Sequence, residues 1–297
     1  MFEASWLWAL FTVVAAGLQT VRNATQRELT GTLGTAGATH VRFLFGLPFA
    51  LVFLVGVLIA TGAAWPWPAL SYWPWVLQGA LAQIAATALM LAAMNDRSFV
   101  VTIAYIKTEP VQVAIFGFLF LGDRLSLAMM AAIVIATAGV VVMAVKPGGA
   151  AGGLRPTFIG LAAGGMFALS AVGFRGAILR LGLPSYLLAA TFTLVIGLAI
   201  QVGLLSVYLL RTPAVTRAIL RAWRPSLFAG FVGALASQFW FLAFALATAA
   251  SVRTLALVEV LFAQAISRFV FKQPTSPREA IGIVLIVAGV ALLIWAY

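Results

Sequence analysis

The stretch "AYIKTEPVQVAIFGFLFLGDRLS", Ala104–Ser126, contains the features that decide the fold class. Two charges, Lys107 and Glu109, and a helix breaker, Pro110, stand inside an apolar run from Phe99 to Leu121. A charge at membrane depth costs about 2.5–3.5 kcal/mol on insertion scales, so such groups face protein or water rather than lipid. Pro110 lacks a backbone N–H and therefore favours a kink. We expect a kinked transmembrane helix that lines the interior of a helical bundle.

The polar residues of this segment follow the period of an α-helix. Thr102, Tyr105, Glu109 and Gln112 are three or four residues apart and share one face. Lys107 lies about 200° around the axis from Glu109, so the two charges do not pair with each other on an intact helix. A kinked helix with a polar stripe is well suited to form the wall of a cavity.

The rest of the chain has the same apolar character. Hydrophobic residues make up 64% of the sequence and charged residues 8%, and the mean hydropathy is +1.11. Most segments are apolar all round, which argues against a soluble helical protein. The expected fold is an all-α integral membrane protein with ten transmembrane helices, near residues 4–22, 39–61, 71–94, 99–121, 126–146, 157–179, 185–210, 226–247, 251–271 and 278–296.

The sequence divides into two similar halves. A shift of 150 residues places Glu109 on Glu259 and Ser126 on Ser276, within matching apolar runs. We therefore expect a first five-helix repeat over 1–146, a Gly-rich linker over 147–156 and a second repeat over 157–297. An odd number of helices in each half makes the two repeats inverted. Chance similarity between apolar helices is the alternative.

The quoted stretch, followed by the small-residue run "IVIATAGVVVMAV", resembles the repeat of the drug/metabolite transporter superfamily, ten-helix type with two EamA-like repeats. The second copy departs from the pattern: "LALVEVLFAQ" lacks the proline, and "FKQPTSP" replaces the Gly-Asp-Arg turn. The resemblance is nearest to bacterial aromatic amino-acid exporters. It implies an inner-membrane secondary transporter that works by alternating access.

The expected function is thus export of aromatic or hydrophobic amino acids, or of related small metabolites. A broad-specificity drug or metabolite exporter and a passive channel are the alternatives. We expect no enzyme, no metal and no cofactor, because the chain has one His, no Cys and no metal-spaced acidic cluster. The expected partners are a small-molecule substrate and the lipid bilayer, without nucleic acid. Monomer and homodimer both remain open.

Polar or aromatic residues within the apolar segments are the candidates for substrate binding. Glu259 must find a partner on another helix or be protonated, since its own face is apolar. Glu109 could instead be a structural partner, for example of Arg42, and Gly139 and Gly289 could serve helix packing or a dimer contact. The candidates are Gln83, Thr102, Tyr105, Lys107, Glu109, Gln112, Trp240 and Glu259.

Loop charge predicts the orientation in the membrane. The loops opposite the termini hold most of the Lys and Arg residues, including the basic stretch 211–224. Basic loops stay in the cytoplasm, so we expect both termini to face the periplasm. Tryptophans such as Trp6, Trp65 and Trp295 gather on the termini side, as an interfacial belt does.

Overall fold

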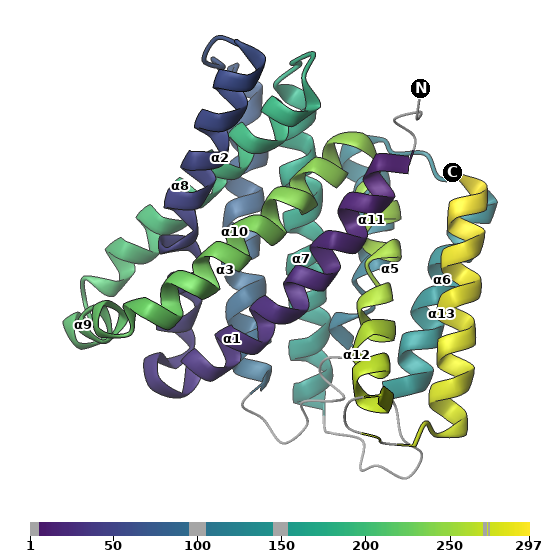
Figure 1. Cartoon of the computed structure of the whole chain (residues 1–297). Coiled ribbons are helices and arrows are strands. Elements are labelled where there is room, and N and C mark those ends of the chain that lie inside the picture. The colour runs from purple at the N-terminus through teal and green to yellow at the C-terminus, as the bar shows by residue number, and fades with distance from the viewer. Residues whose placement is uncertain (1–5, 95–104, 145–153, 270–271, 273) are drawn as a thin grey trace.

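The computed structural model describes residues 6–94, 105–144, 154–269, 272 and 274–297. This part of the chain is helical and contains no β-strand (Figure 1). Within a membrane no water is present to bond the backbone N–H and C=O groups. Each long apolar run therefore pairs these groups with one another in a helix. The elements are α1 (Leu7–Leu44), α2 (Gly46–Thr61), η2 (Leu70–Tyr72), α3 (Trp73–Met94), α5 (Glu109–Phe116), η3 (Gly117–Leu121), α6 (Leu127–Ala144), α7 (Leu154–Arg180), α8 (Tyr186–Leu209), α9 (Pro213–Arg221), α10 (Trp223–Leu246), α11 (Ala249–Leu255), α12 (Val258–Phe269) and α13 (Pro277–Ala296).

Six of the described helical stretches are long and apolar enough to cross a membrane. Several apolar helices of this kind indicate a multi-pass membrane protein. The arrangement of ten crossings in two inverted repeats remains a prediction. The six stretches are Leu29–Thr61, Leu70–Ala92, Phe158–Arg180, Tyr186–Leu209, Trp223–Leu246 and Pro277–Ala296.

The first helix differs from the sequence prediction, which placed a break between residues 22 and 39. Helical structure instead continues through most of this stretch, and the interruption is confined to Gly34, with φ 67° and ψ 175°. Twenty residues of straight helix would separate Arg22 from Arg42 by about 30 Å, yet both line one pocket. The chain therefore turns back at Gly34. Only glycine adopts this backbone conformation at little cost.

The fourth segment is also interrupted where an intact, kinked helix was expected. A turn at Lys107 and Thr108 precedes α5, which begins at Glu109 with Pro110 in its first turn. Proline suits this position because the first turn of a helix needs no N–H donor there. The Tyr105 carbonyl oxygen accepts from both the backbone N–H (3.1 Å) and the hydroxyl (2.6 Å) of Thr108, and these two bonds fix the turn.

A matching break lies in the second half of the chain. Helix α11 ends at Leu255, α12 begins at Val258, and Glu259 stands in the first turn of α12. Glu109 and Glu259, which the 150-residue shift superposes, thus both stand in the first turn of a helix that follows a break. The second break forms without a proline. Irregular backbone at membrane depth occurs where it lines a cavity or is buried in protein.

Helices α6 and α13 pack together at one edge of the bundle (Figure 1). A Cβ added to Gly139 would lie 2.7 Å from the Gly282 carbonyl oxygen, and one added to Gly289 would lie 2.6 Å from the Ala136 nitrogen. The glycines therefore allow the two backbones to approach closely. Of the two interpretations of Gly139 and Gly289, helix packing within the chain is the one observed.

Replacing Gly139 with Ala is expected to lower the free energy of unfolding by about 1–2 kcal/mol, because the added methyl forces α6 and α13 apart. Thermal unfolding in detergent measures the effect. Gly203→Ala in α8 is the matched control, since nothing lies within 4 Å of a Cβ there. Equal melting temperatures for both variants would contradict the close-packing interpretation.

The start of α1 and the end of α13 lie at the same end of the molecule, together with the connection between α2 and α3 (Figure 1). The rings of Trp8 and Tyr297 are 4.7 Å apart at their centroids. Trp65 and Trp67, in the α2–α3 connection, are exposed, as are Trp6 and Trp295. An aromatic belt at the termini end is consistent with this arrangement.

The predicted linker, 147–156, falls largely outside the described residues. Its last three residues, 154–156, already belong to α7, which begins at Leu154. The helix thus begins within the predicted linker, and the division into two five-helix repeats stays a prediction.

Candidate functional site

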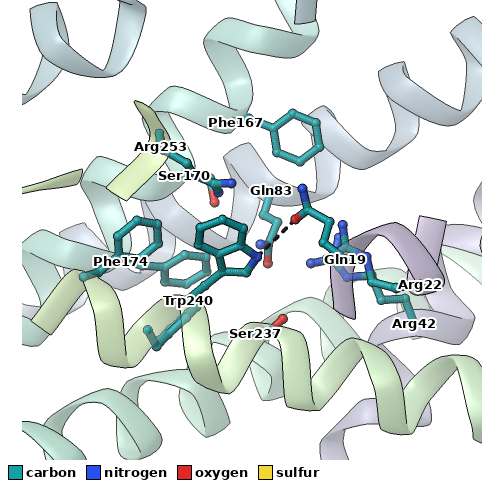
Figure 2. Close-up of a pocket in the computed structure, with 12 residues that line it drawn as sticks. Gln19, Arg22, Arg42, Gln83, Phe167, Ser170, Phe174, Ser237, Trp240 and Arg253 are labelled. Carbon is teal, nitrogen blue, oxygen red and sulfur yellow. Dashed lines mark hydrogen bonds between the residues drawn. The ribbon is translucent and has the colours of Figure 1, made fainter. Parts of the chain in front are cut away.

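A narrow, mostly enclosed cavity lies among α1, α3, α7, α10 and α11 (Figure 2). Its free space holds little more than a water molecule, so a larger ligand requires side chains or helices to move. Both polar and aromatic side chains line it. The lining residues are Gln19, Arg22, Arg42, Gln83, Phe167, Ser170, Phe174, Ser237, Trp240, Phe241, Phe244 and Arg253.

Trp240 of α10 occupies the centre of the site, between Gln19 and the Phe174 side of the cavity (Figure 2). The indole is 3% exposed, and its Nε1 donates to the Gln19 side-chain oxygen (3.1 Å). The Arg253 guanidinium carbon lies 4.5 Å from the centroid of the Trp240 ring and 5.4 Å from that of Phe244. A cation over an aromatic face is attracted by the ring quadrupole, so Arg253 and the indole hold each other in place.

Two ion pairs connect the cavity to the helix breaks. Arg253 Nε lies 3.1 Å from Glu109 Oε1, which joins α11 to the first turn of α5. Lys107, in the turn before α5, pairs with Glu259 in the first turn of α12. Each break of one half is thereby held by a charged group of the other half.

Gln19 connects these contacts into one network. Its amide nitrogen donates to Glu259 Oε2 (3.2 Å), while its amide oxygen accepts from Trp240. The contacts therefore run continuously from Lys107 through Glu259 and Gln19 to Trp240. A buried network in which each member has a partner holds its side chains in defined positions.

Arg22 and Arg42 differ from the other cations of the site because their recorded partners are neutral. Arg22 Nη2 donates to the Asn23 side-chain oxygen (2.9 Å), and Arg42 Nη1 donates to the Thr87 hydroxyl (3.1 Å). Both side chains are buried. Among the acidic side chains that the structure describes, Glu109, Asp123, Glu259 and Glu279, none forms an ion pair with either arginine.

A further ion pair attaches the Gly-Asp-Arg turn of the Ala104–Ser126 stretch to α7. Arg175 Nη2 of α7 lies 3.7 Å from Asp123 Oδ1, and Arg175 Nη1 donates to the carbonyl oxygens of Phe244 (2.7 Å) and Ala247. The turn after α5 is thereby tied to α7 and to the end of α10.

The structure brings some of the predicted site residues together and leaves others apart. Gln83 and Trp240 line the cavity, whereas Lys107, Glu109 and Glu259 lie directly beside it in the two ion pairs. The Gln83 side-chain oxygen accepts from Gln201 (2.8 Å).

Tyr105 and Gln112 do not belong to this group. Tyr105 and Gln112 are absent from the lining of the described cavity, and the Gln112 amide packs instead against Gly164 and Gly165 of α7. The break at Lys107 separates Tyr105 from the face that was predicted for an uninterrupted helix. Thr102 lies outside the described residues.

The suggested pairing of Glu109 with Arg42 is wrong, because Arg253 is the partner of Glu109. Glu109 stands in the first turn of α5, and its carboxylate meets Arg253 of α11 there. Glu259 does find its partner on another segment, as an isolated buried carboxylate requires.

Sequence reasoning missed the cavity residues Gln19, Arg22, Arg42 and Arg253. A usable signal was present for the two arginines at 42 and 253. Both lie inside segments that were predicted to be apolar spans, 39–61 and 251–271, where a charge is costly unless it has a function or a partner. From the sequence, Arg42 is considered only as a possible partner of Glu109, and Arg253 is not singled out.

The sequence matches no protein-family model and no curated protein. Comparison of structures finds a similar fold. A protein solved by crystallography superposes with a TM-score of 0.66 at 17% sequence identity, over 98% of this chain and 97% of that chain. At this identity the likeness shows the fold alone, over essentially the whole length of both chains.

Proposed function

We propose that this chain is a secondary transporter that moves small polar metabolites across a membrane by alternating access. The observation that carries the proposal is a buried cavity of charged, polar and aromatic side chains, enclosed by apolar helices from both halves of the chain. Charged groups within transmembrane segments are costly and commonly mark the path of a substrate or ion.

The two helix breaks support the same proposal. Interrupted helices near the binding site are a recurrent feature of secondary transporters, because unwound backbone and helix ends contact the substrate. Here the breaks before α5 and α12 carry Lys107, Glu109 and Glu259, and their ion pairs cross between the two halves. Rearrangement of such cross-links allows one half to move against the other.

A more specific proposal for the topology, location and substrate follows the resemblance to the ten-helix drug/metabolite transporters. It comprises ten transmembrane helices in two inverted repeats, a bacterial inner-membrane location, and export of aromatic or hydrophobic amino acids or related metabolites. Trp240 and Phe244 would supply an aromatic wall for such substrates. A broad-specificity drug exporter remains the second candidate within the same mechanism.

Transport by purified protein in liposomes tests the proposal. We expect uptake that saturates with substrate concentration and is accelerated by unlabelled substrate on the opposite side of the membrane. The reason is that the binding site of a carrier can reorient with substrate bound as well as without it. Radiolabelled aromatic amino acids and organic acids are the first substrates to try. Flux that rises linearly with concentration and shows no countertransport would identify a passive channel instead.

Membrane orientation is a separate prediction, based on the basic loop around α9. A reporter that is active only in the periplasm should work after Tyr297 and fail between Arg211 and Arg224. The physical reason is that loops rich in Lys and Arg stay on the cytoplasmic side when the chain inserts into the membrane. The opposite pattern of activity would place both termini in the cytoplasm.

A further inference from the structure

The cavity region contains more positive than negative charge. Four cationic side chains, Arg22, Arg42, Lys107 and Arg253, line or adjoin it, whereas the described carboxylates there are Glu109 and Glu259. Lys107 and Arg253 are matched by these two carboxylates. Arg22 and Arg42 have no described carboxylate as a partner, and they account for the excess of positive charge.

The two remaining arginines are placed side by side by the fold. The turn at Gly34 brings their two stretches of α1 to the same cavity. Both side chains pass over Gly233 of α10, where an added Cβ would lie 3.5 Å from Arg22 Cδ and 3.5 Å from Arg42 Cγ. Figure 2 shows them together on the side of the cavity beyond Gln19. They are 2% and 3% exposed.

Neutral partners alone offset little of the cost of burying two like charges. An uncompensated ion in a protein interior loses its hydration, and a second ion of the same sign adds repulsion. An anionic group between the guanidinium groups removes both costs, since each guanidinium donates in a planar geometry that matches a carboxylate or a phosphate. The pair is therefore suited to bind an oxyanion.

We propose that the substrate is a small organic acid with a net negative charge, whose carboxylate or phosphate group binds between Arg22 and Arg42. The organic part lies toward Trp240, the aromatic centre of the cavity. This inference rests on the proposed transport function and narrows its substrate. A neutral amino acid satisfies it less well, because its ammonium group would enter a site that already carries excess positive charge.

Binding to the purified full-length chain tests the proposal with three compounds that share one ring and differ in charge. These are 3-phenylpropionate (anionic), phenylalanine (zwitterionic) and phenylalaninamide (cationic), compared by thermal stabilisation in detergent. We expect 3-phenylpropionate to act at about tenfold lower concentration than either of the others, as a charge-assisted hydrogen bond predicts. Equal or tighter binding of phenylalanine or phenylalaninamide overturns the inference.

Further anions distinguish the two kinds of acidic group. Succinate and phenyl phosphate extend the series to a dicarboxylate and to a phosphate ester. Tighter binding of phenyl phosphate than of 3-phenylpropionate assigns a phosphate-bearing substrate, and the reverse assigns a carboxylate. Absence of binding by all three anions overturns the inference.

Variants of the two arginines connect the binding to the site. Arg22→Gln and Arg42→Gln are expected to weaken anion binding by about tenfold each. Their melting temperatures without ligand should stay equal or rise, because neither change leaves a described carboxylate unpaired. Arg180→Gln, at the exposed end of α7, is the matched control and should leave binding unchanged. Lowered melting temperatures with unchanged anion affinity would show that the two arginines are structural and would overturn the inference.

Flux measured with the same compounds separates this inference from the proposed function. Binding of the anions without any transport refutes the carrier and leaves the anion site established. Transport of phenylalanine or phenylalaninamide without that of 3-phenylpropionate supports the carrier and overturns the anion site.

Discussion

A Glu109→Gln variant is expected to lose about 3–5 kcal/mol of stability, the usual cost of leaving one member of a buried ion pair without its partner. Glu109 lies 3.1 Å from Arg253 Nε, and the two side chains are 12% and 9% exposed. The amide has nearly the shape of the carboxylate but does not neutralise the guanidinium. The loss of stability therefore measures the effect of removing the negative charge, because the packing hardly changes.

The effect is measured as a shift of thermal unfolding in detergent, with transport followed in the same preparations. The double variant Glu109→Gln/Arg253→Gln should recover part of the loss, because it removes the orphaned charge. Glu279→Gln is the control, since Glu279 is a helix-capping carboxylate at an exposed helix start. If Glu109→Gln melts like the wild type while its transport changes, Glu109 acts as a substrate-facing carboxylate and the structural account is wrong.

The second large effect is expected at the pair formed by Lys107 and Glu259. Glu259→Gln should destabilise the protein by about 3 kcal/mol, because Lys107 loses its counter-ion while it remains largely buried. The change also replaces the carboxylate that accepts from Gln19, which in turn positions Trp240. Transport should therefore fall by more than the loss of folded protein explains.

An exchanged pair tests whether the charge or the particular residue matters. Lys107→Glu combined with Glu259→Lys keeps opposite charges on the same two segments and should restore most of the stability lost in either single variant. Restored stability with transport still impaired would assign Glu259 a direct part in transport. Failure to restore stability would mean that the ion pair contributes little to the fold.

Local composition was enough to predict the class of fold. A run such as 185–210, with no charge and a serine at its start, contains the length and hydrophobicity that a membrane helix needs, and the structure has α8 there with Ser185 as its N-cap. The same is true of α13, which begins with the capping box of Ser276 and Glu279. These signals depend on neighbours within a few residues and are therefore readable from the sequence.

The site was predictable only in part. Trp240, Glu109 and Glu259 stood out because polar or large aromatic groups inside apolar runs are conspicuous. Their partners did not stand out, since Arg253 is 144 residues from Glu109 and Lys107 is 152 residues from Glu259. Which of several charges forms a pair depends on distances between helices, and helical periodicity contains no such distances.

By itself the sequence determined that the chain forms apolar helices, where most of them begin and end, and that a few charges must avoid lipid. Only the tertiary structure decided which charges meet. The turn at Gly34 brings Arg22 and Arg42 into one cavity, and the packing of α5 against α11 places Glu109 beside Arg253. The reason is physical: hydrophobicity and capping act over single turns of a helix, whereas ion pairing in a low-dielectric interior depends on how whole helices pack.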